Sequence, residues 1–368
     1  MFSSHIGFGN GKEIPSMRYR VFLCLAALML TALAVLRCLM LPHLPERLPG
    51  AEAPQRRLVR VWVCSSVGGG ESWLRQSLKA WEKKNPGIMT FLRVVTTDEL
   101  TREGTVLPDV LLYTPGTLTA PQEWFAPLNN VAGIREPLLR AGRWQNQQYA
   151  LPLCYAGYAL AIDSAAEPHP AATPAPTTLL GRPAATAEAA SSPTPGIPEN
   201  AGILAPGGCG LFTLGILASD SAPPASTMEQ NSVYQQFRAR QAAAALLTTG
   251  QITALQGTFP FRVITPGEVI TDQVFMASLF PGAETCAADL LAYLISPECQ
   301  RTLSQQGLYT VREDLRLYAA GTEGLMETAA ARSLTAINAY IPKEETDAAA
   351  WQYIQGQQGL STALTPLL

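Results

Sequence analysis

The stretch from Gln148 to Asp163 reads QYALPLCYAGYALAID and is apolar along almost its whole length. An ordinary strand has about five or six residues, so this run is too long for one strand. We interpret it as a segment that crosses between two lobes of the molecule. We therefore expect the chain on either side of it to supply the rest of both lobes.

The chain before the crossing segment alternates predicted strands with a helix. Residues 58–64 form a nearly continuous apolar run rich in β-branched residues, as expected of a strand buried on both faces of a parallel sheet. A glycine turn follows at 65–70, and the apolar spacing after it predicts a helix over 71–85. Two further strands are predicted at 90–95 and 108–113. This order indicates an α/β layered domain.

The chain after the crossing segment begins with residues 164–200, which are mainly Ala, Pro, Ser and Thr. Such a composition buries little apolar surface, so we predict a linker or disordered insert. The sequence from Ser226 to Glu229 fits a capping box, which predicts a helix that continues to about Ala239. The other elements predicted here are strands at 242–247 and 273–279 and helices at 284–296 and 297–306.

The N-terminal region contains an apolar run over 21–41, interrupted at Arg37 and preceded by Lys12, Arg18 and Arg20. The run is long enough to cross a bilayer, with residues 1–20 cytoplasmic by the positive-inside rule. It could equally be a secretory signal that is cleaved after Ala34. In both cases residues 42–56 are a Pro-rich spacer, and we expect the rest on the outer face of the membrane or secreted.

Composition excludes some functions. The chain is 47% hydrophobic and 15% charged, with a formal net charge of −3, so we expect no nucleic-acid partner. Five cysteines lie outside the membrane segment, and their irregular spacing matches neither a disulfide framework nor a metal site. Cys286 with Cys299 is the one pair to test. We expect no metal and no cofactor.

Catalytic motifs are also missing from the sequence. The histidines are His5, His43 and His169, in the N-terminal tail, the spacer and the Ala/Pro tract. No G-x-S-x-G, H-E-x-x-H or C-x-x-C motif occurs, and the glycine turn lacks the lysine of a phosphate-binding loop. We therefore expect a protein that is not an enzyme. A secreted hydrolase that uses paired carboxylates is the third-ranked alternative.

Ligand contacts are predicted where the parallel strands end, because open α/β sheets bind ligands at that edge. The backbone N–H groups of the turn at Ser66 and Gly69 can hold a polar ligand group, although a plain connection is the alternative. Glu71 beside them would repel an anion. Tyr113 ends a strand on the same edge, and Tyr155 could reach a ligand from the crossing segment. Tyr158 could instead pack beneath the hinge.

Several motifs occur in an order that resembles the extracellular solute-binding proteins of ABC importers, in family 1 with the maltose and other sugar receptors. They are Val61-Trp62-Val63 with its glycine turn, Phe125-Ala126-Pro127-Leu128, Ala287 to Leu294, Ser296 to Gln300, and Gly307 to Arg312. The chain departs from the family at Val311, where proline is usual. It also has Gly250-Gln251-Ile252 where many sugar-binding members have Gly-Pro-Trp.

The resemblance implies an α/β fold with two lobes, of the periplasmic-binding-protein type II. Lobe one would comprise 57–160 and 262–312, and lobe two would comprise 161–261 and 313–368. It also implies ligand contacts from lobe two at Gln251 and Tyr340.

The resemblance further implies a monomer that captures a small polar solute, with carbohydrate as one candidate class, and delivers it to an ABC permease. The alternative is a membrane-anchored surface sensor or interaction protein with a degenerate solute-binding fold.

Overall fold

The computed structural model describes residues 28–31, 57–102, 106–165, 203–218 and 225–368. Residues 56–368 form one compact unit, which contains all of the sheets and the buried apolar clusters of the described chain. This part of the chain therefore has its own core and the means to fold independently.

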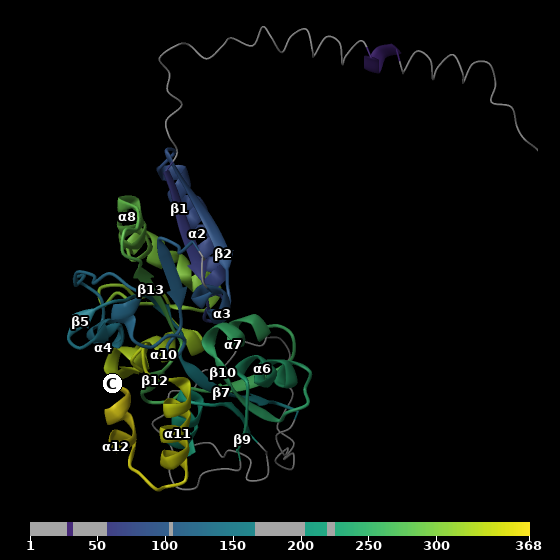
Figure 1. Cartoon of the computed structure of the whole chain (residues 1–368). Helices are drawn as coiled ribbons and strands as arrows, with labels where there is room; N and C mark the ends of the chain where they lie inside the picture. The colour runs from purple at the N-terminus through teal and green to yellow at the C-terminus, as the bar shows by residue number, and fades with distance from the viewer. Residues whose placement is uncertain (1–27, 32–56, 103–105, 166–202, 219–224) are drawn as a thin grey trace, which may run out of the picture. The chain divides into compact units, whose positions relative to one another are not determined.

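The first lobe is built on a six-stranded sheet with the order β14-β6-β13-β3-β1-β2 (Figure 1). Strands β1, β2 and β3 are parallel, whereas β13 and β14 run antiparallel to their neighbours. The strand bounds are β1 Arg57–Val63, β2 Ile88–Val94, β3 Val110–Tyr113, β6 Leu151–Tyr155, β13 Val274–Leu279 and β14 Tyr309–Thr310.

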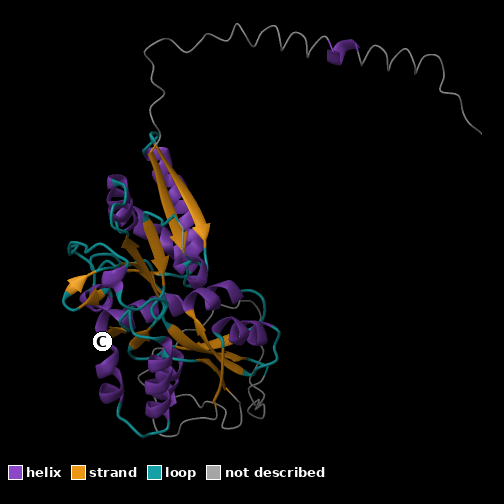
Figure 2. Cartoon of the chain, in the orientation of Figure 1, coloured by secondary structure: helices purple, strands orange, loops and turns teal. Residues whose placement is uncertain are grey.

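Helix α2 (Gly70–Lys84) covers one face of this sheet, because its apolar side chains recur with the helical period and point inward. Trp73, Leu74, Leu78 and Trp81 are buried in one cluster with the inward residues of β1. Figure 2 shows this helix behind the two long strands β1 and β2. The predicted strands and helix of this region are confirmed within two residues at each end.

The second lobe is built on a five-stranded sheet with the order β11-β7-β10-β8-β9. Its strands are β7 Tyr158–Asp163, β8 Ile203–Pro206, β9 Ala225–Met228, β10 Ala244–Thr248 and β11 Phe261–Ile264. Its helices are α5 Cys209–Ala218, α6 Gln230–Arg238 and α7 Thr249–Leu255. Helix α5 is apolar on nearly all sides because it is covered on its outer side by α11 (Lys343–Ile354).

The predicted crossing segment is confirmed. Strand β6 pairs in the first sheet, β7 pairs in the second, and only Ala156 and Gly157 separate them. Gly157 allows close packing here, because a Cβ atom there would lie 2.5 Å from Cε of Met326 and would force that side chain to move. The apolar run is therefore long because it supplies a fully buried strand to each sheet.

The remaining elements complete the layers around the sheets. They are α3 Thr97–Thr101, α4 Glu136–Ala141, β4 Arg143–Trp144, β5 Gln147–Gln148, β12 Val269–Thr271, α8 Thr285–Leu294, α9 Pro297–Gln300, α10 Gly321–Arg332, β15 Leu334–Ala336 and α12 Leu360–Leu364, together with short 3₁₀ turns at Pro121–Glu123, Arg301–Gln306 and Thr365–Leu367.

Two predictions for the second lobe are wrong in detail. Residues 226–228 belong to strand β9, and helix α6 begins only at Gln230 without a side-chain cap at Glu229. The capping box of this region is formed instead by Thr248 and Gln251 at the start of α7. The local pattern was ambiguous because Ser and Thr suit an edge strand as well as a helix N-terminus.

The sheet pairing divides the lobes differently from the ranges expected from sequence. All of β7 lies in the second sheet, so the first crossing lies at 156–157 and not at 160–161. Strand β11 also pairs with β7, although 262–264 were expected in lobe one. The residues of a buried apolar strand do not indicate which of two sheets it joins, because both cores accept the same apolar side chains.

The structure contains no disulfide among its described residues. Cys286 and Cys299 are both free, and the Cys299 thiol donates to Ser77 Oγ at 3.3 Å. The predicted anchor at 21–41 lies outside the described residues apart from 28–31, and no helix in the described part is long and apolar enough to span a membrane. The Ala/Pro tract also lies outside the described residues beyond Ala165.

Gln300 ties three elements of the first lobe together from a fully buried position. Its Nε2 donates to the carbonyls of Leu153 and Leu294 at 2.8 and 2.9 Å. Its Oε1 accepts from the hydroxyl of Thr310 at 2.7 Å and from the N–H of Val311 at 3.1 Å. One amide therefore satisfies four polar groups, which belong to β6, the end of α8, β14 and the residue that follows β14.

We predict that Gln300→Leu lowers the free energy of unfolding by about 3 kcal/mol, because four buried polar groups lose their partner. Urea denaturation of residues 56–368 measures the change. Gln305→Leu is the control, since Gln305 is exposed on the following turn and should change stability by less than about 0.5 kcal/mol. Equal effects for the two variants would contradict this role of Gln300.

Candidate functional site

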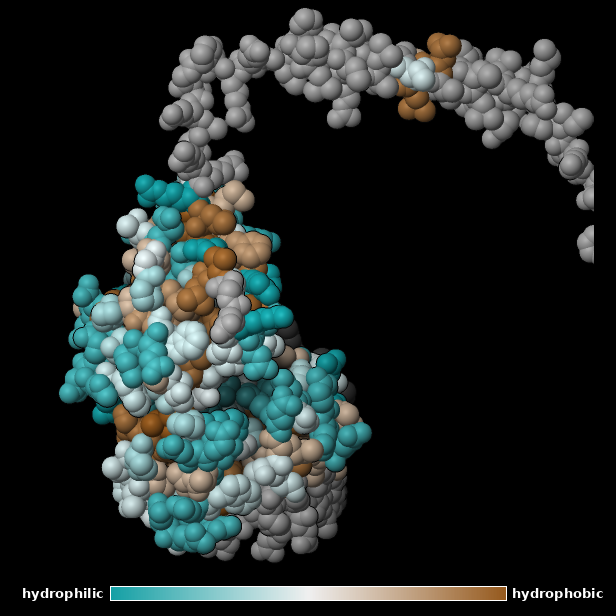
Figure 3. Space-filling model, viewed as in Figure 1, coloured by the Kyte–Doolittle hydropathy of each residue, from teal (hydrophilic) through white to brown (hydrophobic). Residues whose placement is uncertain are grey.

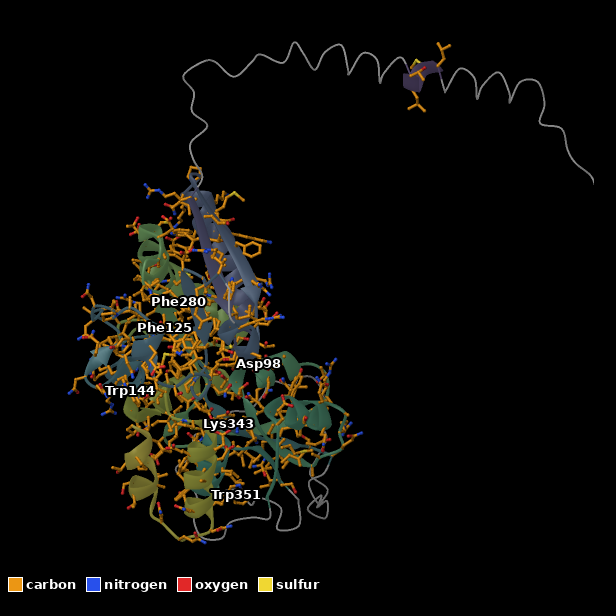
Figure 4. The ribbon with its side chains drawn as sticks, in the orientation of Figure 1. Asp98, Phe125, Trp144, Phe280, Lys343 and Trp351 are labelled. Carbon is orange, nitrogen blue, oxygen red and sulfur yellow. The ribbon has the colours of Figure 1, made fainter. Side chains whose placement is uncertain are left out.

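A cavity of ≈ 560 Å³ lies where strands of both lobes end, and residues from each lobe line it. From the first lobe come the turn after β1 and the loop after β3, at 114–116. From the second come the ends of β8 and β9 and the starts of α6 and α7. Lys343, at the start of α11, also lines this cleft and is labelled in Figure 4. The cleft is thus a space between two lobes.

The wall from the first lobe is held by Ser65, just outside the cleft. Its Oγ accepts from the N–H and the hydroxyl of Thr114, both at 2.9 Å, and it hydrogen-bonds to Thr117 Oγ1 at 2.7 Å. These bonds join the turn after β1 to the loop after β3. Gly69 caps α2 with a φ of 84°, a conformation that glycine adopts without strain.

The wall from the second lobe contains a half-buried carboxylate, Asp272, and a buried phenol, Tyr158. The Tyr158 hydroxyl donates to Asp272 Oδ1 at 2.9 Å, and the N–H of Cys209 donates to Oδ2 at 3.3 Å. Burial, followed by the Asp272 carboxylate, raises the pKa of Tyr158 well above its usual value. The phenol therefore stays protonated as a donor. Asp272 sits at the N-terminus of α5, where the helix dipole favours a negative charge.

The two lobes touch through backbone at one end of the cleft. A Cβ atom at Gly250, in the first turn of α7, would lie 2.9 Å from the carbonyl oxygen of Gly68 and 3.3 Å from that of Gln306. Gly307 faces the same helix, since its Cβ would lie 3.0 Å from the Cα of Gly250. Because these glycine residues have no side chain, the backbones of the two lobes can approach each other this closely.

Three of the six residues predicted to contact a ligand line the cleft. Ser66 and Gly69 lie on the wall from the first lobe, and Gln251 lies on the wall from the second. The amide oxygen of Gln251 is already occupied, because it accepts from the N–H of Thr248 at 3.0 Å in the capping box. A ligand-binding role stays a prediction for these three residues.

The other three predicted residues, Tyr113, Tyr155 and Tyr340, are buried in the core and do not line the cleft. The Tyr113 hydroxyl hydrogen-bonds to Ser278 at 2.8 Å and to Tyr340 at 3.2 Å, and burial raises the pKa of Tyr113 to about 12. Tyr155 packs against Tyr309 with ring centroids 5.4 Å apart. Their expected placement on the cleft wall is therefore wrong, because inward strand positions bury Tyr113 and Tyr155 and the turn after β15 buries Tyr340.

Sequence reasoning missed several polar residues of the cleft wall. Tyr155 was the expected contact from the crossing segment, but Tyr158 lines the cleft instead. Tyr158 is the first residue of β7, the second strand of that segment. Glu229, Gln230, Asn231, Asp272, Gln273 and Lys343 also line it. The only signal in the sequence was that Asp272 and Gln273 interrupt an apolar run just before a strand.

The charges of the cleft are mostly negative. Glu71, Glu229 and Asp272 line it, whereas the single basic residue among its described lining residues, Lys343, pairs with Asp347 at 2.6 Å. Tyr158 is the one aromatic residue among them and is 2% exposed. No group of three metal-ligating side chains occurs in the described part of the chain. The cleft can therefore offer hydrogen bonds and negative charge, but little aromatic surface.

No protein-family model matches the chain, and no curated protein sequence does. The fold, in contrast, matches many solved structures. The GacH receptor of Streptomyces glaucescens, solved unliganded and with acarbose, is 12% identical and has a TM-score of 0.56 over 83% of this chain and 95% of its own. The sugar-binding protein MalE of Xanthomonas citri is 14% identical, with a TM-score of 0.55 over 84% and 95%.

The chain has the fold of the two-lobed solute-binding proteins. The expected fold class is therefore confirmed. A third structure of this fold is described as a two-component system protein that mediates signal transduction. It is 12% identical, with a TM-score of 0.51 over 78% of this chain and 98% of its own. At these identities the comparisons establish the fold alone.

We predict that Gly250→Ala lowers the free energy of unfolding by about 1 to 3 kcal/mol, because the added methyl group meets two backbone carbonyls that must move apart. Urea denaturation tests this. Gly267→Ala is the control, since no atom lies within 4 Å of a Cβ there. A helix position alone would favour alanine over glycine, so a more stable Gly250→Ala protein would show that the lobes do not meet here in solution.

Proposed function

We propose that this protein is the extracellular substrate-binding component of an ABC importer and captures a small polar solute between its lobes. The observation that carries the proposal is the cleft of ≈ 560 Å³ lined from both lobes. Its volume lies within the usual range for small-molecule sites, and a site at the interface of two lobes is typical of binding by domain closure. The likeness in fold to sugar-binding receptors supports the same reading.

The lining favours a solute that is neutral or positively charged and rich in hydrogen-bonding groups. Ser66, Ser72, Asn231 and Gln273 can donate to and accept from hydroxyl groups, so a polyol or carbohydrate is compatible. Because three carboxylates line the cleft, an anionic solute would be repelled. Stacking on a sugar face is not expected from Tyr158, which is buried.

The proposed role requires binding and release without covalent chemistry. The N-terminal run at 21–41 would hold the protein at the outer face of the membrane, either as an anchor or until cleavage. A monomer would then deliver the solute to a permease in the same membrane.

A second candidate function is a membrane-anchored sensor with the same fold. The likeness to a structure described as part of a two-component system favours it. Neighbouring genes distinguish the two candidates, since an importer component is expected beside permease genes and a sensor beside a kinase gene.

We predict that a thermal-shift screen of residues 56–368 identifies a stabilising solute among sugars, polyols, amino acids and polyamines. A ligand at 100 times its Kd should stabilise the folded state by about 2.7 kcal/mol. Phosphate, sulfate and dicarboxylates serve as the anionic set and should give no shift. Stabilisation by anions alone would contradict the proposed electrostatics, and no shift from any class would contradict solute capture.

Once a solute is found, we predict that the double variant Ser66→Ala, Asn231→Ala raises its Kd about tenfold. Both residues are exposed on opposite walls of the cleft, so each loses about one hydrogen bond without unfolding the protein. Isothermal titration measures the change. The matched control is Asn130→Ala, Ser361→Ala, at exposed positions outside the cleft lining, which should leave Kd unchanged.

A further inference from the structure

One face of the first sheet has little cover over β1 and β2. Crossover connections between parallel strands are right-handed. Helix α2 leads from β1 to β2 on one face, so the connection that returns from β2 past β1 to β3 belongs on the other. In its described residues that connection has a single helix, α3, of five residues. Parallel sheets are almost always covered on both faces, so an uncovered face is unusual.

The uncovered face presents apolar side chains to solvent. Leu58 pairs with Met89 and Arg60 pairs with Phe91 in the parallel register, so these residues point to the same side. Leu58 is 48%, Met89 45% and Phe91 54% exposed. Figure 3 shows hydrophobic residues gathered over β1 and β2 in the upper part of this view. Such a group of exposed apolar residues marks an interaction site.

This apolar surface continues beyond the two strands. Val106 and Leu107, 67% and 38% exposed, border a second cavity of ≈ 470 Å³ together with Arg60, Trp124 and Phe280. Phe280 is labelled in Figure 4 beside Phe125, against whose ring it packs at 5.3 Å. We call the surface formed by Leu58, Met89, Phe91, Val106 and Leu107 the bare face.

The edge of the sheet is protected, in contrast to its face. The N–H and the hydroxyl of Thr90 both donate to Glu82 Oε1, at 2.5 and 2.6 Å. A carboxylate over the edge of β2 opposes the addition of another strand. A partner of this region is therefore expected to lie flat against the bare face.

We propose that the bare face rests on the lipid bilayer to which the chain is tethered. The proposal relies on the anchoring of 21–41 proposed above. Residues 42–56 span at most roughly 50 Å when fully extended, and β1 begins directly after them at Arg57. The bare face, with Leu58 at its start, is therefore the first folded surface beyond the spacer.

The chemistry of the bare face suits the membrane interface. Apolar side chains would enter the boundary between headgroups and acyl chains. Arg60 and Arg93 point to the same side of the sheet, where their guanidinium groups pair with Asp109 at 3.3 Å and with Glu99 at 3.1 Å, so the contact rests on the apolar side chains. Strand β1 runs from this end of the lobe to the cleft, a distance of about 23 Å at ~3.3 Å per residue. None of the five residues of the bare face lines the cleft, so contact with the bilayer would not occupy the cleft lining.

The test is flotation of residues 56–368, which fold as a unit, with vesicles of phosphatidylcholine containing one quarter phosphatidylglycerol. We expect the wild type to float and the double variant Leu58→Ser, Phe91→Ser to bind at least about tenfold more weakly. Val94→Ser is the matched control. Val94 is 52% exposed on the same strand but faces the other side of the sheet, so its replacement should not change flotation.

Three results would overturn the proposal. The first is no flotation of the wild type, and the second is equal loss for the control. The third is a dimer in sedimentation equilibrium without lipid that the double variant abolishes, which would assign the bare face to a second copy of this chain. Solute binding is measured on the same preparation, so a protein that binds solute but not vesicles loses only this inference. A protein that floats but binds no solute loses only the proposed importer role.

Discussion

The structure depends on the passage of one continuous segment, residues 151–163, through both sheets. Because β6 and β7 are joined by Ala156 and Gly157 alone, the two sheets cannot lie far apart. Gly157 packs against Met326 so closely that a side chain there would displace it. Strands of both lobes consequently end around one shared space. The position of the cleft between the two sheets therefore follows from this connection and does not depend on which residues form its walls.

Two kinds of contact shape the lobes, one within the first lobe and one between the lobes. Gln300 holds β6 and β14 of the first lobe in place with a fully satisfied amide. Glycine residues, in turn, let the second lobe approach, since Gly250 lies against the carbonyl of Gly68. Rigid lobes that meet through backbone contacts can separate and close again as units, which suits capture by hinge motion. The hydrogen bonds of Ser65 join the turn after β1 to the loop after β3 within the first wall.

The first lobe carries two surfaces at opposite ends of β1. At its C-terminal end the strand enters the polar, negatively charged wall of the cleft. At its N-terminal end the strand follows the spacer and lies within the bare face. Polar and apolar surfaces thus occupy different stretches along the same strand. In the role proposed here, one lobe would hold the solute at the cleft and contact the membrane through the bare face.

The sequence by itself determined the α/β class, the two lobes and most element positions, because apolar periodicity depends on local spacing that a single chain displays. It also placed Ser66 and Gly69 at the cleft, since turns after parallel strands belong at the ligand-binding edge, whereas Gln251 was expected there only from the family resemblance. Only the tertiary structure decided that Tyr113, Tyr155 and Tyr340 are buried and that Tyr158, Asp272 and Lys343 line the cleft. The physical reason is that an aromatic or charged residue near a strand end can point into the core or into the cleft. The packing of segments that are distant in sequence, such as β14 against β6, decides between these two orientations.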